Sequence, residues 1–326
     1  EDAARAVTDC FLGQPHYDGT SNFLVDQGVV NGKQDNNLFH VEGFANAPLE
    51  PDVPLRDNIR RVQTSFGLKP IDQLEGDGRT LTIEMETGTG KTFTYIKTMF
   101  ELNKLYGWTK FIVVVPSIAI REGVLSSFDS MSEYFAQEYG KRIQYFVYNS
   151  KQLSKIDSFA ADAGIHVMII NTQAFNTSLN EDKNKEGRAG DAAARIIFSR
   201  RDEFRSRRPI DILAATHPIM IIDEPQSVLG ANKTNQTRKG LKLFNSLFKL
   251  LYSATHRKDD IANMVYRLDA MDAYNKHLVK KIEVVGVEQK GTTATNGYVY
   301  LEQILISTGN PQARINYDVM RKSGTV

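Results

Sequence analysis

The sequence predicts a three-layer α/β fold built on a mainly parallel sheet, and three observations carry this prediction. Short apolar segments alternate with helical segments between residues 80 and 255, which is typical of a parallel sheet covered by helices on both faces. A glycine-rich loop follows the first of these apolar segments and opens a helix. A later apolar segment ends in two adjacent acidic residues.

Hydrophobic spacing assigns the individual elements in order. Helices are predicted at residues 3–12, 56–68, 93–105, 119–139 and 152–163. Strands are predicted at residues 81–85, 110–115, 142–148, 166–170 and 218–222, with another directly before Ser253. Weaker patterns favour strands at residues 281–287 and 298–306. The chain contains no internal repeat and no low-complexity tract.

Two segments interrupt this alternation. Residues 13–54 are rich in Gly, Asn, Asp and Pro and lack a period, so they predict a long irregular insertion. Residues 177–208 begin with a polar stretch and continue as a predicted helix that ends in arginines. These arginines are Arg200, Arg201, Arg205, Arg207 and Arg208. Two interpretations stay open for them: a solvated surface, or a patch that contacts nucleic-acid phosphates.

The glycine-rich loop has the residues of a phosphate-binding loop. Gly88 and Gly90 let backbone N–H groups close around phosphate oxygens, and the N-terminus of the following helix adds positive charge. Lys91 can reach the β- and γ-phosphates, and the Thr92 hydroxyl can hold Mg²⁺. Met85 departs from the general pattern, which has a small residue there. The predicted ATP-binding residues are Thr87, Gly88, Thr89, Gly90, Lys91 and Thr92.

The acidic pair at residues 223 and 224 supplies carboxylates for metal binding and water activation, which the glycine-rich loop at residues 87–92 does not contain. Asp223, at the end of its strand, can hold the water shell of Mg²⁺ opposite Thr92. Glu224 is placed to orient and deprotonate the attacking water, and Gln226 to sense the γ-phosphate. We therefore predict that ATP and Mg²⁺ are the cofactors.

A third polar segment follows the next apolar strand and reads Ser253-Ala254-Thr255-His256. Alone it could be a helix N-cap or a polar turn. Behind the two preceding motifs, Ser253 and Thr255 are interpreted as hydroxyl groups that couple the nucleotide state to the grip on nucleic acid. His256 could equally be an ordinary surface histidine.

Composition limits the other classes of protein. The chain has 326 residues, of which 41% are hydrophobic, and a formal net charge of +1, so any surface for nucleic acid must be a local patch. Cys10 is the only cysteine, which excludes an intrachain disulfide and a four-cysteine zinc site. The longest apolar run, residues 111–120, is far too short to span a membrane. We expect a soluble, cytoplasmic protein.

Four motifs resemble motifs I, Ia, II and III of superfamily 2 helicases. They read METGTGKT, VVVPSIAIREGV, IIDEPQ and YSATH, at residues 85–92, 113–124, 221–226 and 252–256. More narrowly, the chain resembles the restriction (Res) subunit of type III restriction–modification enzymes. The segments at residues 266–268 and 272–274 also indicate this branch. The resemblance covers about residues 1–285.

This resemblance implies a RecA-like P-loop NTPase fold and an ATP-dependent hydrolase. Residues 1–285 would form the first motor lobe, with insertions at about 13–54 and 177–208. ATP hydrolysis would drive translocation or switching on double-stranded DNA before cleavage. The nucleotide and hydrolysis residues would be Lys91, Thr92, Asp223 and Glu224, and the coupling residues Ser253 and Thr255.

The resemblance also implies two kinds of partner. Ser117, Asn171 and Gln173 would lie on the DNA track and contact phosphates without reading the sequence. Arg200 and Arg201 are further candidates for DNA contact. Sequence recognition would belong to a separate methyltransferase (Mod) subunit.

Several expected parts of such an enzyme have no match in the sequence. A helicase motor needs a second RecA-like lobe, whose arginines complete the charge clamp around ATP. We expect this lobe and the nuclease to be absent, and residues 286–326 to be a linker or the start of the next domain. Glu288 and Lys290 have a nuclease-like spacing that is common by chance. The adenine-reading glutamine is not located, and Gln63 is only a weak candidate.

Two alternatives stay open. The first is another superfamily 2 motor, such as a type I restriction motor or a repair helicase. The Asp-Glu-Pro-Gln motif at residues 223–226 differs from the commonest relatives of that kind. The second is a non-catalytic DNA-binding scaffold with a degenerate nucleotide site, against which the intact Lys91 and Glu224 argue.

Overall fold

The structure, a computed structural model, describes most of the chain. The described residues are 1–17, 22–24, 29–30, 33–34, 42–175, 195–232, 236–279, 299–305 and 312–317. The chain divides into two compact units, Glu1–Lys280 and Lys281–Val326, and each is described by itself.

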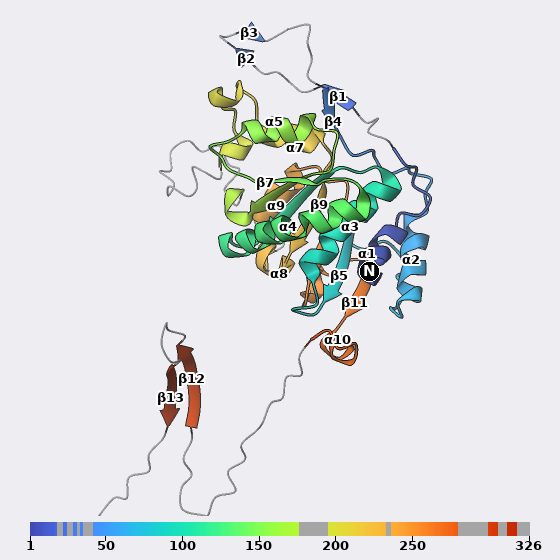
Figure 1. Ribbon diagram of the computed structural model, residues 1–326, viewed down its shortest axis with the longest axis vertical. Coiled ribbons are helices and arrows are strands. Elements are labelled where there is room, and N and C mark those ends of the chain that lie inside the picture. The colour runs from blue at the N-terminus through green and yellow to red at the C-terminus, as the bar shows by residue number, and fades with distance from the viewer. Residues whose placement is uncertain are drawn as a thin grey trace, which may run out of the picture. The chain divides into compact units, whose positions relative to one another are not determined.

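A seven-stranded sheet forms the centre of the first unit (Figure 1). Its strands, in spatial order, are β11 (Met264–Leu268), β5 (Thr80–Met85), β10 (Lys249–Ser253), β9 (Ile219–Asp223), β6 (Lys110–Val115), β8 (His166–Asn171) and β7 (Gln144–Val147). All neighbouring pairs in this sheet are parallel. The predicted α/β fold with a mainly parallel sheet is therefore confirmed.

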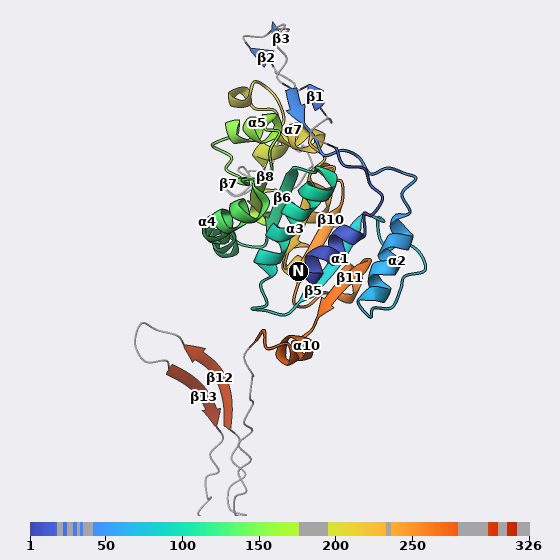
Figure 2. The same cartoon turned by 45° about the vertical axis from the view of Figure 1, so that its right-hand side comes forward.

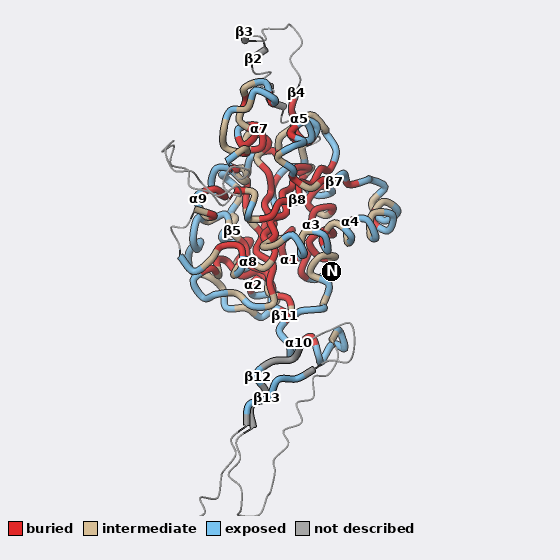
Figure 3. Tube along the Cα trace, turned by 90° about the vertical axis from the view of Figure 1, so that its left-hand side faces the viewer, coloured by how far each residue is buried: buried red, intermediate tan, exposed pale blue. Residues whose placement is uncertain are grey.

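The central strands are apolar along their whole length because both of their faces are covered. In β6, Phe111 and Val113 belong to the hydrophobic cluster on one face, whereas Ile112 and Val114 belong to the cluster on the other. Such continuous apolar runs are what a buried parallel strand requires. Figure 3 shows this sheet as the most deeply buried part of the chain trace.

Helices form the two outer layers (Figures 1 and 2). Those on one face are α1 (Asp2–Asp9), α2 (Leu55–Ser65), α3 (Lys91–Tyr106) and α4 (Ile118–Tyr139). Those on the other face are α5 (Ser154–Ala161), α7 (Pro209–Ala215), α8 (Pro225–Val228) and α9 (Gln236–Leu243). A short helix, α10 (Ala270–Asn275), follows β11.

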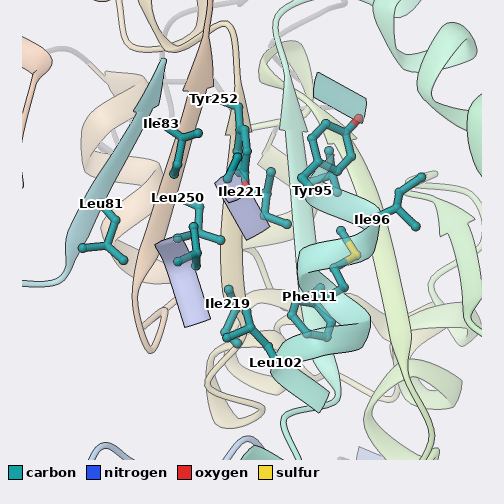
Figure 4. Packing of buried hydrophobic residues seen from close by; sticks show 14 of the residues in the cluster. Leu81, Ile83, Tyr95, Ile96, Leu102, Phe111, Ile219, Ile221, Leu250 and Tyr252 are labelled. Atoms are coloured by element: carbon teal, nitrogen blue, oxygen red, sulfur yellow. The ribbon is translucent and has the colours of Figure 1, made fainter. Parts of the chain in front are cut away.

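The helix that follows the glycine-rich loop is firmly anchored on the sheet. Tyr95 of α3 packs edge-on against Tyr252 of β10, with ring centroids 5.7 Å apart (Figure 4). The Tyr252 hydroxyl lies 3.1 Å from the Thr98 hydroxyl, also on α3. This contact fixes the start of α3 relative to the strand that ends at Ser253.

Part of the predicted insertion at residues 13–54 is a buried structural element. Short antiparallel pairs form between β1 (Asn22–Leu24) and β4 (Glu42–Phe44) and between β2 (Val29–Val30) and β3 (Lys33–Gln34). Asn46 is buried and accepts hydrogen bonds from the backbone N–H groups of Thr109 and Lys110. Its amide donates to the carbonyl oxygens of Lys110 and His217. Asn46 therefore joins the starts of β6 and β9.

The helix predicted to end in arginines is not continued through them. Residues 195–208 contain two short 3₁₀ helices, η2 (Ile196–Phe198) and η3 (Asp202–Phe204). Arg205 and Ser206 have positive φ angles, which a helix cannot contain. The preceding part of that prediction lies outside the described residues.

In the second unit, β12 (Val299–Leu305) and β13 (Gln312–Tyr317) form an antiparallel pair. β12 agrees with the strand predicted at residues 298–306. The strand predicted at residues 281–287, and Glu288 with Lys290, lie outside the described residues. In the described part of the chain, no helix has the length and apolar character needed to cross a membrane.

Candidate active site

The predicted phosphate-binding loop connects the end of β5 to the start of α3. Gly88 and Gly90 have φ angles of 81° and 89°, a left-handed conformation that side chains other than glycine rarely adopt. The Thr89 hydroxyl and backbone N–H both donate to the Glu86 carbonyl oxygen, at 2.6 and 3.2 Å. Helix α3 starts directly at Lys91, so its free N–H groups face the loop.

Strand register brings the three motifs to one edge of the sheet. Ser253 lies opposite Glu84 of β5, and Tyr252 lies opposite Asp223 of β9. Because all three strands are parallel, the loop, the acidic pair and the Ser253 segment follow their carboxyl ends. This edge is where open α/β sheets bind ligands.

Asp223 has the surroundings of a cation ligand. The residue is only 6% exposed. Burial, and next the charge of Glu224, raise its pKa to about 6 against the opposing effect of Lys91. Its Oδ1 atom is buried and has no hydrogen-bond partner. A buried carboxylate oxygen without a donor fits a divalent cation.

The residues around Asp223 fit Mg²⁺, which needs few protein ligands. No group of three or more His, Cys, Asp or Glu residues in the described part of the chain could hold a metal ion. Mg²⁺ is usually bound by one or two carboxylates together with substrate phosphates and water. Asp223 and the Thr92 hydroxyl are the protein groups that could take part.

Glu224 is held by three side chains. Lys91 Nζ lies 2.5 Å from its Oε1, while Gln226 Nε2 and Ser253 Oγ donate to its Oε2 at 2.6 and 2.7 Å. Burial alone would raise the pKa of Glu224, but these hydrogen bonds hold it below its ordinary value. Glu224 is therefore a carboxylate in the described structure.

The backbone at Glu224 is strained. Its φ and ψ angles are 51° and 62°, a left-handed conformation that is uncommon outside glycine, asparagine and aspartate. Pro225 follows as the first residue of α8. Strain of this kind is concentrated at functional sites.

Ser253 connects its own segment to the acidic residue. Its hydroxyl lies within hydrogen-bond distance of Glu224 Oε2 at 2.7 Å, the Thr255 carbonyl oxygen at 2.8 Å and Gln226 Oε1 at 3.0 Å. A hydroxyl has one proton and can donate to only one of these acceptors at a time. Small movements of this segment can therefore change the hydrogen bonding of Glu224. Thr255 is exposed to solvent.

His256 is not an ordinary surface histidine. Its Nε2 lies 3.0 Å from the Ile83 carbonyl oxygen in β5, and a carbonyl can only accept, so Nε2 carries the proton. Burial lowers the pKa of His256. The ring therefore ties the Ser253 segment to the strand that leads into the phosphate-binding loop.

Sequence reasoning missed Tyr95. The Tyr95 side chain is fully buried, and burial, followed by the charge of Asp223, raises its pKa well above the ordinary value. The spacing of Tyr95 from the phosphate-binding loop could have indicated its position. Tyr95 follows Lys91 by four residues and Thr92 by three, so all three share one face of α3.

Three predicted DNA contacts gather at the same sheet edge, beyond the acidic pair. Ser117 caps α4, and its Oγ accepts from the Ile120 N–H at 3.3 Å. Asn171 ends β8 opposite Val115 and lies 3.4 Å from the exposed Gln173. Gln173 lies in the 3₁₀ helix η1 (Thr172–Ala174).

Arg200 and Arg201 lie on a different segment, which packs against α5 and α7. Arg200 donates to the Ser206 carbonyl oxygen, and Arg201 pairs with Glu203. Their neighbour Arg207 is buried, pairs with Asp157 of α5 at 2.7 Å and lies over the Phe204 ring. Arg207 therefore has a structural role.

Gln63 does not have a free amide with which to read a base. The residue is buried in α2, its Nε2 donates to the Met264 carbonyl oxygen, and its Oε1 accepts from the Ile71 N–H. The Nε2 hydrogen bond holds α2 against β11, and the Oε1 hydrogen bond holds the loop that follows α2.

The model of the family described as "Type III restriction enzyme, res subunit" matches residues 56–258. The chain belongs to this family. The match includes the phosphate-binding loop, the acidic pair and the Ser253 segment. The predicted resemblance to type III Res subunits is thus confirmed.

Two Res subunits among the curated relatives have similar sequences. The EcoP15I Res subunit of Escherichia coli is 33% identical over 244 residues, and the EcoPI Res subunit of Escherichia phage P1 is 32% identical over 238 residues. Each comparison covers 69% of this chain and 23% of the relative. This Res-family chain therefore spans about a quarter of the length of those relatives.

Among solved structures, one similar chain is a nuclease-deletion mutant of the type ISP restriction–modification enzyme LlaGI in complex with a DNA substrate mimic. It is 15% identical with a TM-score of 0.40, and the comparison covers 68% of this Res-family chain and 18% of that chain.

Proposed function

We propose that this chain is the ATP-binding motor lobe of a type III restriction endonuclease Res subunit. Mg-ATP hydrolysis then drives translocation or switching on double-stranded DNA before cleavage. The observation that carries the proposal is the meeting of Lys91, Asp223, Glu224 and Ser253 at one edge of the sheet, within the range that the family model matches.

The binding step follows from the contacts of the loop. Gly88 and Gly90 leave backbone N–H groups free to surround phosphate oxygens. Lys91 exchanges its carboxylate partner Glu224 for the β- and γ-phosphates. Thr92 and the unpartnered Asp223 oxygen would hold Mg²⁺, which would neutralise phosphate charge.

The hydrolysis step follows from the release of Glu224. Once Lys91 turns to phosphate, Glu224 Oε1 becomes free to accept a proton from the attacking water. Its other oxygen stays hydrogen-bonded to Gln226 and Ser253, which fixes the orientation of the carboxylate. Ser253 and Thr255 then transmit the state of the nucleotide to the DNA-facing side.

DNA contact is assigned to the residues that extend the same edge. Ser117, Asn171 and Gln173 contact the phosphate backbone, with Arg200 and Arg201 as further contacts. The Mod subunit of the same system supplies sequence recognition. Residues 1–285 form the first RecA-like lobe, and residues 286–326 are a linker or the start of the next domain.

The test is nucleotide binding and hydrolysis with and without duplex DNA. Lys91→Ala should abolish high-affinity Mg-ATP binding, whereas Lys104→Ala, an exposed lysine near the other end of α3, should not. This chain should hydrolyse ATP slowly, since the charge clamp of a second lobe is not among its motifs. A Lys91→Ala variant with full nucleotide affinity would instead indicate a degenerate site.

A further inference from the structure

A polar groove of about 540 Å³ runs beside the edge strand β7. Its lining includes Arg121, Asn149, Ser150, Gln152, Lys155 and Ala174. β7 has a neighbour on one side only, β8, so its other edge has no strand partner in the described part of the chain. The proposed ATPase chemistry uses none of these residues.

A second hollow of about 480 Å³ adjoins the first. The two share Ser150 and Gln152, and the second adds Lys151, Arg201 and Glu203. We call the two together the edge groove. Its far end therefore reaches Arg201. The edge groove thus connects Arg201, which lies on a separate segment, with the other proposed DNA contacts.

The near end of the edge groove meets those residues. The Arg121 N–H donates to the Ser117 carbonyl oxygen, so Arg121 lies one helical turn along α4 from the capping serine. Ala174 directly follows Gln173 in η1. The edge groove thus forms one path from Ser117 and Gln173 to Arg201.

The charges along this path favour a polyanion. Arg121, Lys151, Lys155 and Arg201 line the edge groove, against the single carboxylate of Glu203 among the described lining residues. Lys151 and Lys155 are exposed and have no ion-pair partner in the described part of the chain. The pair between Arg121 and Glu122 is on the surface, where ion pairs are weak and readily exchanged.

The remaining polar groups suit a sugar-phosphate backbone. Asn149 and Gln152 are exposed amides, and Ser150 is a half-buried hydroxyl. Side chains of these types contact phosphates and sugars without reading base sequence. A neutral peptide added to β7 as an extra strand would leave Lys151 and Lys155 without an anionic partner.

We infer that the edge groove binds the backbone of duplex DNA and extends the contact surface from Ser117 and Gln173 to Arg201. This inference rests on the proposed DNA-binding function. Lys151 and Lys155 are its principal phosphate contacts, and Gln152 lies where its two hollows meet.

The first experiment measures duplex affinity by fluorescence anisotropy at several salt concentrations. The Lys151→Ala/Lys155→Ala double variant should bind more weakly, and its plot of log affinity against log salt should lose about 2 from its slope, roughly one per phosphate contact. The matched control is Lys69→Ala/Lys104→Ala, which removes two exposed lysines away from the edge groove. Its slope should stay that of the unsubstituted chain.

The second experiment locates the DNA directly. Cys10, the only cysteine, is fully buried, so an introduced thiol will be the reactive one. Gln152→Cys should form a disulfide with a duplex that carries a thiol-reactive tether on its backbone. Gln73→Cys, an exposed glutamine in the loop before β5, should not.

The outcomes separate the two proposals. If the unsubstituted chain binds duplex DNA but the double variant keeps its slope and Gln152→Cys crosslinks no more than Gln73→Cys, the edge groove is excluded and DNA binding elsewhere stands. If the unsubstituted chain does not bind duplex DNA, the DNA part of the proposed function is wrong, and the edge groove with it. Protection of the Gln152→Cys thiol by a peptide strand and not by duplex would assign the site to a protein partner.

Discussion

Lys91 Nζ lies 2.5 Å from Glu224 Oε1, so the lysine of the phosphate-binding loop is paired with the acidic residue that we propose activates water. Both side chains are largely buried, at 13% and 25% exposed. In this arrangement the Lys91 ammonium group and the Glu224 carboxylate are bound to each other. Under the proposed function, nucleotide binding and the release of Glu224 are one event, because phosphate would replace the carboxylate at Lys91.

Replacing Glu224 separates these two consequences. Glu224→Gln removes the base but keeps the size of the side chain, so hydrolysis should fall by roughly 10²–10⁴-fold. Mg-ATP affinity should stay the same or rise, because nucleotide binding no longer has to break the ion pair between Lys91 and Glu224. Single-turnover hydrolysis and equilibrium binding measure the two effects. Glu133→Gln, on an exposed position of α4, is the control, and a Glu224→Gln variant with an unchanged rate would rule out this role.

The buried Asp223 should destabilise the free protein at neutral pH. Its pKa is about 6 in the folded chain, against an ordinary value of 3.8. Above pH 6 the carboxylate is charged in both states, and the folded state bears the full cost, up to about 3 kcal/mol at 1.36 kcal/mol per pKa unit. Below about pH 4 it is protonated in both states and the cost vanishes.

Asp223→Asn should therefore raise the free energy of unfolding at pH 7.5, by at most about 3 kcal/mol, while it abolishes Mg²⁺-dependent hydrolysis. The gain should shrink as the pH falls toward 4. Denaturant unfolding without Mg²⁺ or nucleotide gives the comparison, with the exposed Asp52→Asn as control. A variant less stable than the parent at pH 7.5 would contradict a destabilising carboxylate.

Ionisation of Asp223, which destabilises the free protein, should favour Mg²⁺ binding. Only the ionised Asp223 can hold the water shell of Mg²⁺, so Mg²⁺-dependent tightening of ATP-analogue binding should be lost as the pH falls through about 6. Binding measured with and without Mg²⁺ between pH 5 and 8 tests this. Asp223→Asn is the control, because any pH dependence that belongs to the nucleotide persists in it. A Mg²⁺ effect of equal size at pH 5 and 8 would count against Asp223 as the ligand.

Local patterns in the sequence were enough to predict six of the seven strands of the sheet, all except β11, and the residues at its carboxyl edge. The apolar run at residues 110–115 predicts a strand that the structure has as Lys110–Val115. Glycines at residues 88 and 90 have the left-handed conformations that a phosphate-binding loop needs. Such features depend on neighbours within a few residues, and a single sequence contains that information.

Features that depend on distant contacts could not be predicted. Asn46 lies in a stretch without periodicity, yet its partners are 63 to 171 residues away along the chain. Arg207 belongs to an arginine cluster that suggests phosphate binding. In the structure it pairs with Asp157 and lies over the Phe204 ring, and so links α5 to the segment that contains Phe204. The hydrogen bond from His256 to Ile83 likewise spans 173 residues. Residue type and spacing do not contain these pairings.

Asn46 should therefore contribute strongly to stability. Asn46→Ala leaves the buried N–H groups of Thr109 and Lys110 and the carbonyl oxygens of Lys110 and His217 without this partner. We expect a loss of roughly 2–5 kcal/mol in the free energy of unfolding. Asn275→Ala, an exposed asparagine at the end of α10, should change it by less than about 0.5 kcal/mol. Equal effects of the two substitutions would show that Asn46 is not a structural link.

Ser253 should set the protonation of Glu224 as well as its orientation. The Ser253 hydroxyl is one of three donors that hold the pKa of Glu224 below its ordinary value against the effect of burial. Ser253→Ala removes this donor, so the pKa of Glu224 should rise and the acidic limb of the pH–rate profile for ATP hydrolysis should move to higher pH. Nucleotide affinity should change little, because Lys91 and Asp223 are untouched. Ser253→Cys has nearly the same size and a weaker donor, so its profile should lie between those of the parent and Ser253→Ala. An acidic limb at the parent's position in both variants would mean that Ser253 acts only through packing.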